Sequence, residues 1–213
     1  MANKINSNEK DREIKAIIFD YGGVITVNLD RMVRKLVKKI FNVEDEEIKK
    51  YYHKLNSLIT RGMITEDEFW QRFAKSFCKR IENKKYKGLL QEKYAKKTRN
   101  RPGIISIVKK LKKDYRVGLL SDTYKPFAEY NIKNRRYSLF NPLILSCYVK
   151  MEKPDKRMYL HIIKKLKLEP NECVFIDDHE VNARAADSVG MHGIVYTNNS
   201  SLLKEMRKLG VRI

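Results

Sequence analysis

The sequence has 213 residues, 42% hydrophobic and 34% charged, a length that suits one ordinary domain with an insertion and argues against two equal domains. No uncharged run reaches the roughly 18 residues of a membrane-spanning helix, and the polar opening segment MANKINSNEKDREIK resembles no secretory signal, so we expect residues 1–13 to be a disordered lead-in to a cytoplasmic protein. Its 46 Lys and Arg residues against 26 Asp and Glu give a formal net charge of +20, which would attract an anionic substrate.

The first predicted element is a buried strand over residues 14–19, a short apolar run rich in β-branched residues. It runs into Asp20, and the following Gly22-Gly23 pair predicts a tight turn. From residue 29 to residue 41 the hydrophobic period becomes that of an amphipathic helix.

Residues 28–98 form a predicted helical block without a convincing strand. A second helix is expected over residues 44–59, a third begins at the capping box Thr65-Glu66-Asp67-Glu68, and a fourth covers about residues 84–98. The third helix carries an inner row of aromatic side chains, namely Phe69, Trp70, Phe73 and Phe77.

After Arg101-Pro102-Gly103 the predicted helices and strands alternate. The expected helices cover residues 104–113, 125–135, 155–167, 182–189 and 201–209. The expected strands cover residues 116–120, 173–176 and 193–196, with a strand or a strand plus loop over 142–149. Continuous apolar strands that alternate with amphipathic helices predict an α/β fold, a Rossmann-like parallel sheet with helices on both faces. The core domain then comprises residues 14–27 and 99–213, with residues 28–98 as a helical insertion after the first strand.

The cysteines Cys78, Cys147 and Cys173 are far apart and show no C-x-x-C spacing. Two of them lie in apolar, strand-like runs. This pattern favours buried free thiols over a metal site or a disulfide.

Polar side chains stand at the carboxyl ends of four predicted strands, where open parallel sheets bind their ligands. They are Asp20, Ser121-Asp122, Lys153 and Asp177-Asp178. Each alone has a structural explanation as a turn residue, a helix cap or a surface lysine. Together they predict a phosphate and Mg²⁺ site, because carboxylates bind the cation, a hydroxyl and an ammonium hold the anion, and a further carboxylate can attack phosphorus.

At these residues the sequence resembles the haloacid dehalogenase superfamily, from about residue 14 to residue 196. The stretches that carry the resemblance are AIIFDYGGVI, VGLLSDT, MEKPDKRMY and VFIDDHEVNARAADSVGM. The resemblance implies that Asp20 is the nucleophile that becomes an aspartyl-phosphate. It also implies that Ser121 binds the substrate phosphate and that Lys153 steadies the nucleophile and the phosphate.

The same resemblance implies a Mg²⁺ ion held by Asp20, by Asp178 and by the backbone carbonyl of Gly22. Asp177 and Asn182 would support that site. The helical block at residues 28–98 occupies the place of the family's small α-helical cap, which closes over the site and selects substrates.

Two positions depart from the family pattern. The phosphatase motif D-x-D has a second Asp that protonates the leaving group, and here that position is Gly22; such a group is typically worth about 10²- to 10⁴-fold in rate. A branch with D-x-G, which includes sugar-1-phosphate phosphatases and the N-terminal domain of epoxide hydrolases, resembles this chain more closely. Asp122 stands where that branch has Asn, either as a substitute acid and phosphate-site residue or, as we favour, as a hydrogen-bonding group of the loop.

The predicted function is Mg²⁺-dependent hydrolysis of a small phosphorylated metabolite such as a sugar phosphate. A dehalogenase would leave Asp177-Asp178 unexplained, and no persuasive lysine of the helical block supports a phosphonatase. A non-catalytic phosphate-binding regulator stays open because of Gly22. Nucleic-acid binding is less favoured despite the net charge of +20, since lysine pairs recur along the whole chain on polar helix faces.

Overall fold

A computed structural model describes residues 13–80 and 86–213 of the chain, so the prediction of disorder for residues 1–13 lies outside the described residues apart from Glu13. Its sheet contains five parallel strands in the order β3-β2-β1-β4-β5. In chain order the strands are β1 (Ala16–Phe19), β2 (Arg116–Ser121), β3 (Leu143–Leu145), β4 (Cys173–Asp177) and β5 (His192–Val195). Among the described residues, no helix combines the length and apolar character that a membrane crossing requires.

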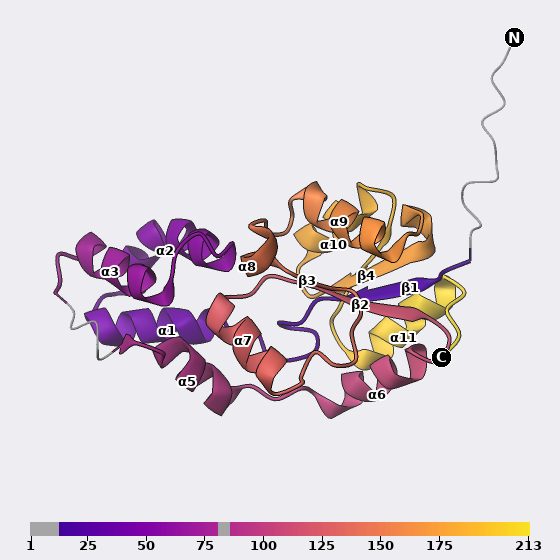
Figure 1. Ribbon diagram of the computed structural model, residues 1–213, viewed down its shortest axis with the longest axis horizontal. Coiled ribbons are helices and arrows are strands. Elements are labelled where there is room, and N and C mark those ends of the chain that lie inside the picture. Colours follow the sequence, from indigo (N-terminus) through magenta and orange to yellow (C-terminus); the bar gives the residue numbers. More distant parts are fainter. Residues whose placement is uncertain (1–12, 81–85) are drawn as a thin grey trace, which may run out of the picture.

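Helices cover both faces of this sheet (Figure 1). On one face lie α9 (Lys156–Leu166) and α10 (Glu180–Asp187), and on the other lie α6 (Pro102–Leu111) and α11 (Asn199–Lys208). Successive strand residues point to opposite faces, so Ile18 packs with the α9 side chain Tyr159, while Ile17 packs with Ile104 of α6. The interior positions of the strands are therefore apolar, as the sequence predicts for a parallel sheet covered on both faces. The predicted α/β fold class is confirmed.

The described residues between β1 and α6 form helices and no regular strand. These helices are α1 (Asp30–Phe41), α2 (Asp45–Thr60), α3 (Glu66–Ser76) and α5 (Leu89–Lys97), which lie together at one end of the molecule (Figure 1). Phe69 and Phe73 are fully buried at their centre, and Leu36 and Ile40 pack against the same cluster. This aromatic core is separate from the two cores beside the sheet.

One helix of the sheet region belongs to both parts. Helix α7 (Lys125–Lys133) buries Ala128 in the core of the sheet, whereas Phe127 joins the core of the helical insertion. The Phe127 ring stacks on Tyr94 of α5 with their centroids 4.4 Å apart. The insertion is thus packed onto the sheet region through α7.

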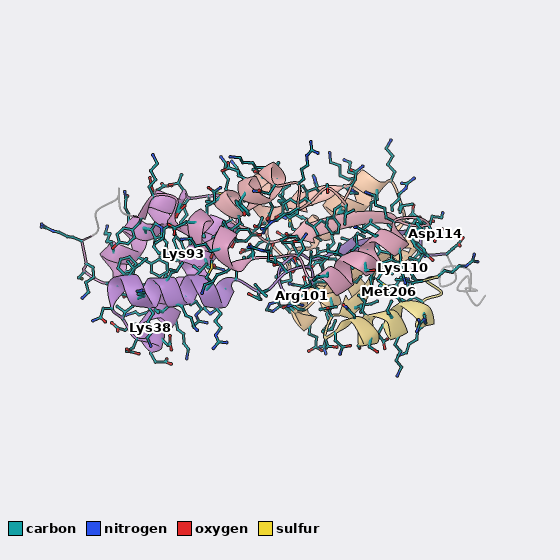
Figure 2. The ribbon with its side chains drawn as sticks, turned by 90° about the horizontal axis from the view of Figure 1, so that it is seen from below. Lys38, Lys93, Arg101, Lys110, Asp114 and Met206 are labelled. Atoms are coloured by element: carbon teal, nitrogen blue, oxygen red, sulfur yellow. The ribbon has the colours of Figure 1, made fainter. Side chains whose placement is uncertain are left out.

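The two chain segments that lead into and out of the insertion are bonded to each other, and Arg101 lies at this junction (Figure 2). Its backbone N–H donates to the Ile25 carbonyl at 2.8 Å, and its guanidinium donates to the Gly23 carbonyl at 2.8 Å. The Thr26 hydroxyl donates to the Arg99 carbonyl at 2.9 Å. These bonds hold the two linkers side by side.

Three local expectations differ from the structure. Of residues 142–149, only Leu143–Leu145 pairs with β2, and the chain then turns into the short helix α8 (Ser146–Val149); an apolar run this short does not distinguish a strand from a buried helical turn. The helix expected over residues 84–98 is α5, which begins at residue 89, and residues 84 and 85 lie outside the described part. Among the free cysteines, Cys147 and Cys173 are buried but Cys78 is exposed, so its predicted burial is wrong. A short 3-10 helix, η2 (Pro170–Glu172), precedes β4.

Candidate active site

The predicted site residues meet at the carboxyl edge of the sheet. Asp20 follows the central strand β1, Ser121 ends the neighbouring β2, and Asp177 ends β4 on the other side. The Asp20 backbone N–H continues the sheet by donating to the Ile176 carbonyl at 2.8 Å. Since these strands are adjacent and parallel, their terminal side chains face one common space.

Lys153 joins two of the strand ends. Its Nζ lies 2.7 Å from an Asp20 carboxylate oxygen and 2.6 Å from an Asp177 oxygen, and its side chain is only 2% exposed. Asp177 also accepts the backbone N–H of His179 at 2.8 Å and the Asn182 amide at 3.1 Å. Asp177 and Asn182 therefore fix the lysine, and the lysine in turn fixes the Asp20 carboxylate.

Asp122 bonds to the loop that carries the lysine. Both of its carboxylate oxygens lie 3.2 Å from the backbone nitrogen of Lys153, which donates to them. This is the geometry of the loop-bonding alternative for Asp122. The neighbouring Ser121 is 1% exposed, and its side chain lines the same cavity as Asp20.

The turn after Asp20 lies directly against Asp178. Gly23 has a φ of +82°, and a Cβ there would lie 2.0 Å from a carboxylate oxygen of Asp178, so only glycine allows this approach. A Cβ on Gly22 would meet no atom within 4 Å. The Oδ1 atom of Asp178 is buried and has no hydrogen-bond partner among the described residues, which leaves it free to bind a ligand.

Three carboxyl groups at this edge, those of Asp20, Asp122 and Asp178, have raised pKa values. Burial raises the pKa of Asp20 to about 8, although the Lys153 ammonium opposes the shift. Burial likewise raises the pKa of Asp122 to about 6 and raises that of Asp178. Burial disfavours the charged form of Lys153, but Asp20 and Asp177 outweigh it and hold its pKa well above the ordinary value. The site thus has more carboxyl groups than ammonium groups to balance them, an arrangement that a divalent cation would offset.

A group of three carboxylates could supply the ligands of such a cation. Asp20, Asp177 and Asp178 each place one oxygen within 4.8 Å of the others. The carboxylates of Asp20 and Asp178 lie beside the turn at Gly22-Gly23, whose backbone carbonyl groups are further oxygen donors. Oxygen donors of these kinds are the ligands that Mg²⁺ prefers. These residues fit a Mg²⁺ ion.

Above the carboxylates is a cavity of about 640 Å³, within the size range of small-molecule sites. Its floor is formed by residues of the sheet edge, including Asp20, Gly22, Ser121, Asp122, Lys153, Asp178 and Asn182. Its roof is formed by the helical insertion, through Asn28, Leu29, Asp30, Arg31, Val33, Asn56, Thr60 and Tyr94. Access to the carboxylates is therefore shaped by both parts of the chain.

Sequence reasoning missed several residues of this cavity. Tyr124 and Thr123 directly follow the predicted pair Ser121-Asp122, so their position after a strand end was an available signal. Asn56 gave none, because a polar residue on a predicted helix does not reveal which neighbour that helix face meets.

Comparison with known proteins adds to this geometry. The sequence matches the family described as haloacid dehalogenase-like hydrolase over residues 14–190. It is 26% identical over 208 residues to D-ribitol-5-phosphate phosphatase of Bacteroides thetaiotaomicron, covering 91% of this chain and 97% of that protein. It is 38% identical over 68 residues to flavin mononucleotide hydrolase 1 of Arabidopsis thaliana, a match that spans 32% of this chain and 28% of that protein.

The fold is also found among solved structures. A HAD family enzyme of Bacteroides thetaiotaomicron, in complex with magnesium and inorganic phosphate, superposes with a TM-score of 0.72 at 23% identity. The superposition covers 89% of this chain and 98% of that enzyme.

Proposed function

Since the chain belongs to the haloacid dehalogenase-like hydrolases, whose family model matches residues 14–190, we propose that it hydrolyses a small phosphomonoester with the help of Mg²⁺. One observation carries the proposal. Lys153 joins the buried carboxylates of Asp20 and Asp177 at 2.7 and 2.6 Å, on the floor of a cavity and beside the unpartnered Oδ1 of Asp178. A relative that aligns with 91% of this chain is named as a phosphatase of a sugar-alcohol phosphate, D-ribitol 5-phosphate. This name is consistent with the proposed reaction.

In this proposal, Asp20, Asp178 and the Gly22 carbonyl hold the Mg²⁺ ion, and Asp177 and Asn182 support them from behind. When bound, the ion neutralises charge on the phosphate oxygens and on the carboxylates. The Oδ1 atom of Asp178, which has no hydrogen-bond partner in the part of the chain that the structure describes, fits this role.

Asp20 is the proposed nucleophile. Its carboxylate oxygen attacks phosphorus, the bond from phosphorus to the leaving oxygen breaks, and an aspartyl-phosphate forms. Ser121 and Lys153 hold the phosphate oxygens, and the lysine keeps the carboxylate oriented at 2.7 Å. A water molecule then attacks the aspartyl-phosphate, which releases inorganic phosphate and restores Asp20.

The departing oxygen needs a proton, and Gly22 cannot supply it. Asp122 has a pKa raised by burial to about 6, but both of its oxygens accept the Lys153 backbone N–H. Because of these hydrogen bonds, Asp122 positions the loop that carries Lys153 in the proposed mechanism. Protonation of the leaving group is then left to solvent, so esters with basic leaving groups react more slowly than aryl esters do.

We propose that residues 28–98 act as the cap of this enzyme and that residues 14–27 and 99–213 act as its core. The cavity supports this division, because core residues line its catalytic floor and helical residues line its roof. Leaving-group contacts then come mainly from the cap.

The test is turnover of p-nitrophenyl phosphate with Mg²⁺, followed by EDTA and by Asp20→Asn. We expect turnover that EDTA abolishes, and at least a 100-fold loss in the variant, because an amide replaces the attacking oxygen without changing its size. Asp114→Asn is the matched control and should retain full activity, because Asp114 is exposed and precedes β2, at the opposite end of this strand from Ser121. Phosphate binding without turnover of any phosphoester would instead identify a regulator, and undiminished activity in Asp20→Asn would identify another nucleophile.

A further inference from the structure

Helix α2 of the insertion is held against the sheet region at several points near its carboxyl end. The Ser57 hydroxyl donates to a Glu152 carboxylate oxygen, and the Ser146 hydroxyl donates to the Thr60 carbonyl at 2.7 Å. Gly62, with a φ of +63°, lies so close to Cys147 that a Cβ there would be 2.3 Å from its carbonyl oxygen. The side chains of this part of α2 are therefore fixed relative to the catalytic edge.

One of these side chains, Asn56, lines the cavity and is oriented by the sheet region. The Tyr124 hydroxyl donates to the Oδ1 atom of Asn56. Tyr124 is 5% exposed and stacks on Phe127 with ring centroids 5.0 Å apart, so its hydroxyl cannot move freely. With Oδ1 engaged, the Nδ2 group of Asn56 is left to bind, and within the described residues it has no hydrogen-bond partner.

The surrounding roof of the cavity has a mixed but electrically balanced lining. Asp30 and Arg31 are neighbours in the sequence and carry opposite charges. Asp30 interacts with the Tyr52 hydroxyl, whereas the Arg31 side chain forms no hydrogen bond or ion pair among the residues that the structure describes. Leu29 and Val33 of the same segment give the lining apolar surface. Such a roof suits a neutral carbon chain that carries hydroxyl groups, since apolar surface packs the carbons and the free polar groups bind the hydroxyls.

We propose that Asn56 determines leaving-group specificity, by donating its Nδ2 hydrogens to a hydroxyl of a neutral sugar or polyol phosphate. Tyr124 is the positioning residue that orients Asn56. The inference rests on the proposed phosphatase function and names its substrate class. A polar group held in place in this way penalises a substrate that lacks its partner, because the donor is then left unpaired.

The test compares a pentitol 5-phosphate with n-pentyl phosphate, which have equal chain length and differ in their hydroxyl groups. The readout is the ratio of kcat/KM for the two substrates. We expect the wild type to favour the pentitol ester and Asn56→Leu to lower this ratio about 10- to 100-fold, the effect of one lost hydrogen bond with its unpaired partner. The competitive inhibition constant of inorganic phosphate should stay within about 3-fold, since Asn56 does not belong to the proposed phosphate-holding residues.

Two controls separate specificity from structure. His53→Leu changes an exposed residue of the same helix and should leave both the ratio and phosphate inhibition unchanged. Tyr124→Phe keeps the ring stack but removes the bond to Asn56, so it should lower the ratio by a smaller factor than Asn56→Leu does. The double variant should then be no less selective than Asn56→Leu alone, because Tyr124 acts through Asn56.

Asn56→Ala covers the case in which Asn56→Leu does not fold. This variant removes the whole amide group without adding side-chain volume, and it should lower the ratio as well. An unchanged ratio in a folded Asn56 variant, or a wild type that hydrolyses both esters equally, would overturn the specificity inference while leaving the phosphatase intact. No turnover of any phosphoester by the wild type would instead contradict the proposed function.

Discussion

The electrostatic balance of the site depends on a single buried ammonium group. Lys153 lies between Asp20 and Asp177 at 2.7 and 2.6 Å, and its removal would leave two buried carboxyl groups without a positive partner. Without that partner, the buried Asp20 carboxyl would take up a proton instead of remaining charged. The proposed nucleophile, Asp20, therefore depends on Lys153 for ionisation as well as for orientation.

Gly22→Asp tests the missing acid, and the local structure has space for the change. A Cβ at position 22 meets no atom within 4 Å. We expect the variant to speed the hydrolysis of alkyl phosphates about 10- to 100-fold and that of aryl phosphates far less, because a proton donor helps most when the departing oxygen is basic. The measurement is kcat for an alkyl and an aryl ester under matched Mg²⁺. Equal changes for the two esters would show that leaving-group protonation does not limit the rate.

The raised carboxyl pKa values predict pH-dependent Mg²⁺ binding. Burial raises the pKa of Asp20 to about 8 and also raises that of Asp178, so in the metal-free protein both groups tend to hold protons that the ion must displace. Mg²⁺ affinity should increase as the pH rises from 6 to 8 and level off above that. Titration calorimetry in two buffers of different ionisation enthalpy measures both the affinity and the released protons. An affinity that is constant over this range would contradict the prediction.

Sequence could predict the residues of the cavity floor because each ends a strand or lies in the segment that follows one, and parallel strands deliver their carboxyl ends to one edge. Asp20, Ser121, Lys153 and Asp178 all lie there. The bond from Tyr124 to Asn56 was beyond such reasoning, because it joins residues 68 positions apart that the packing of the insertion core brings together. Periodicity identifies an apolar face but not the surface that it meets.

Among the elements, the strands were more predictable in type than in extent. The apolar run at residues 142–149 contains both β3 and α8, and the change occurs where pairing with β2 ends at Leu145. The helices at 29–41 and 44–59 correspond closely to α1 and α2, since their amphipathic pattern spans three turns or more. Tertiary pairing therefore decided the boundary where the local pattern was short.

Gly62→Ala tests the docking of α2 against α8. The φ of +63° is unfavourable for alanine, and the new Cβ would lie 2.3 Å from the backbone oxygen of Cys147, so the contact must open. We expect a loss of roughly 1–3 kcal/mol in the free energy of unfolding, measured by urea denaturation, together with a raised KM. Gly88→Ala is the matched control, because Gly88 also has a positive φ but a Cβ there meets no atom within 4 Å; it should lose less stability and keep its KM.

At the scale of the whole molecule, the two parts of the chain are not independent bodies. Helix α7 buries residues in both the sheet core and the insertion core, and the paired linkers at Arg101 close the joint on one side (Figure 2). Figure 1 shows the insertion as an end-on extension of the sheet's carboxyl edge. The chain thus closes its cavity by packing two cores against a shared helix.

Ser146 couples the binding of an anion at the sheet edge to the docking of α2. Its hydroxyl donates to the Thr60 carbonyl of α2 at 2.7 Å and accepts the Thr123 backbone N–H at 2.9 Å, two residues beyond Ser121. An anion that orders the loop after β2 must then stabilise the docked position of α2, and by reciprocity the docked helix must tighten anion binding by the same factor. Hydrogen exchange should report this linkage: with Mg²⁺ and inorganic phosphate the amides of residues 61–63 should exchange more slowly, and Ser146→Ala should abolish that slowing. If phosphate did not change the exchange rates of the wild type, α2 and the loop after β2 would not be energetically coupled.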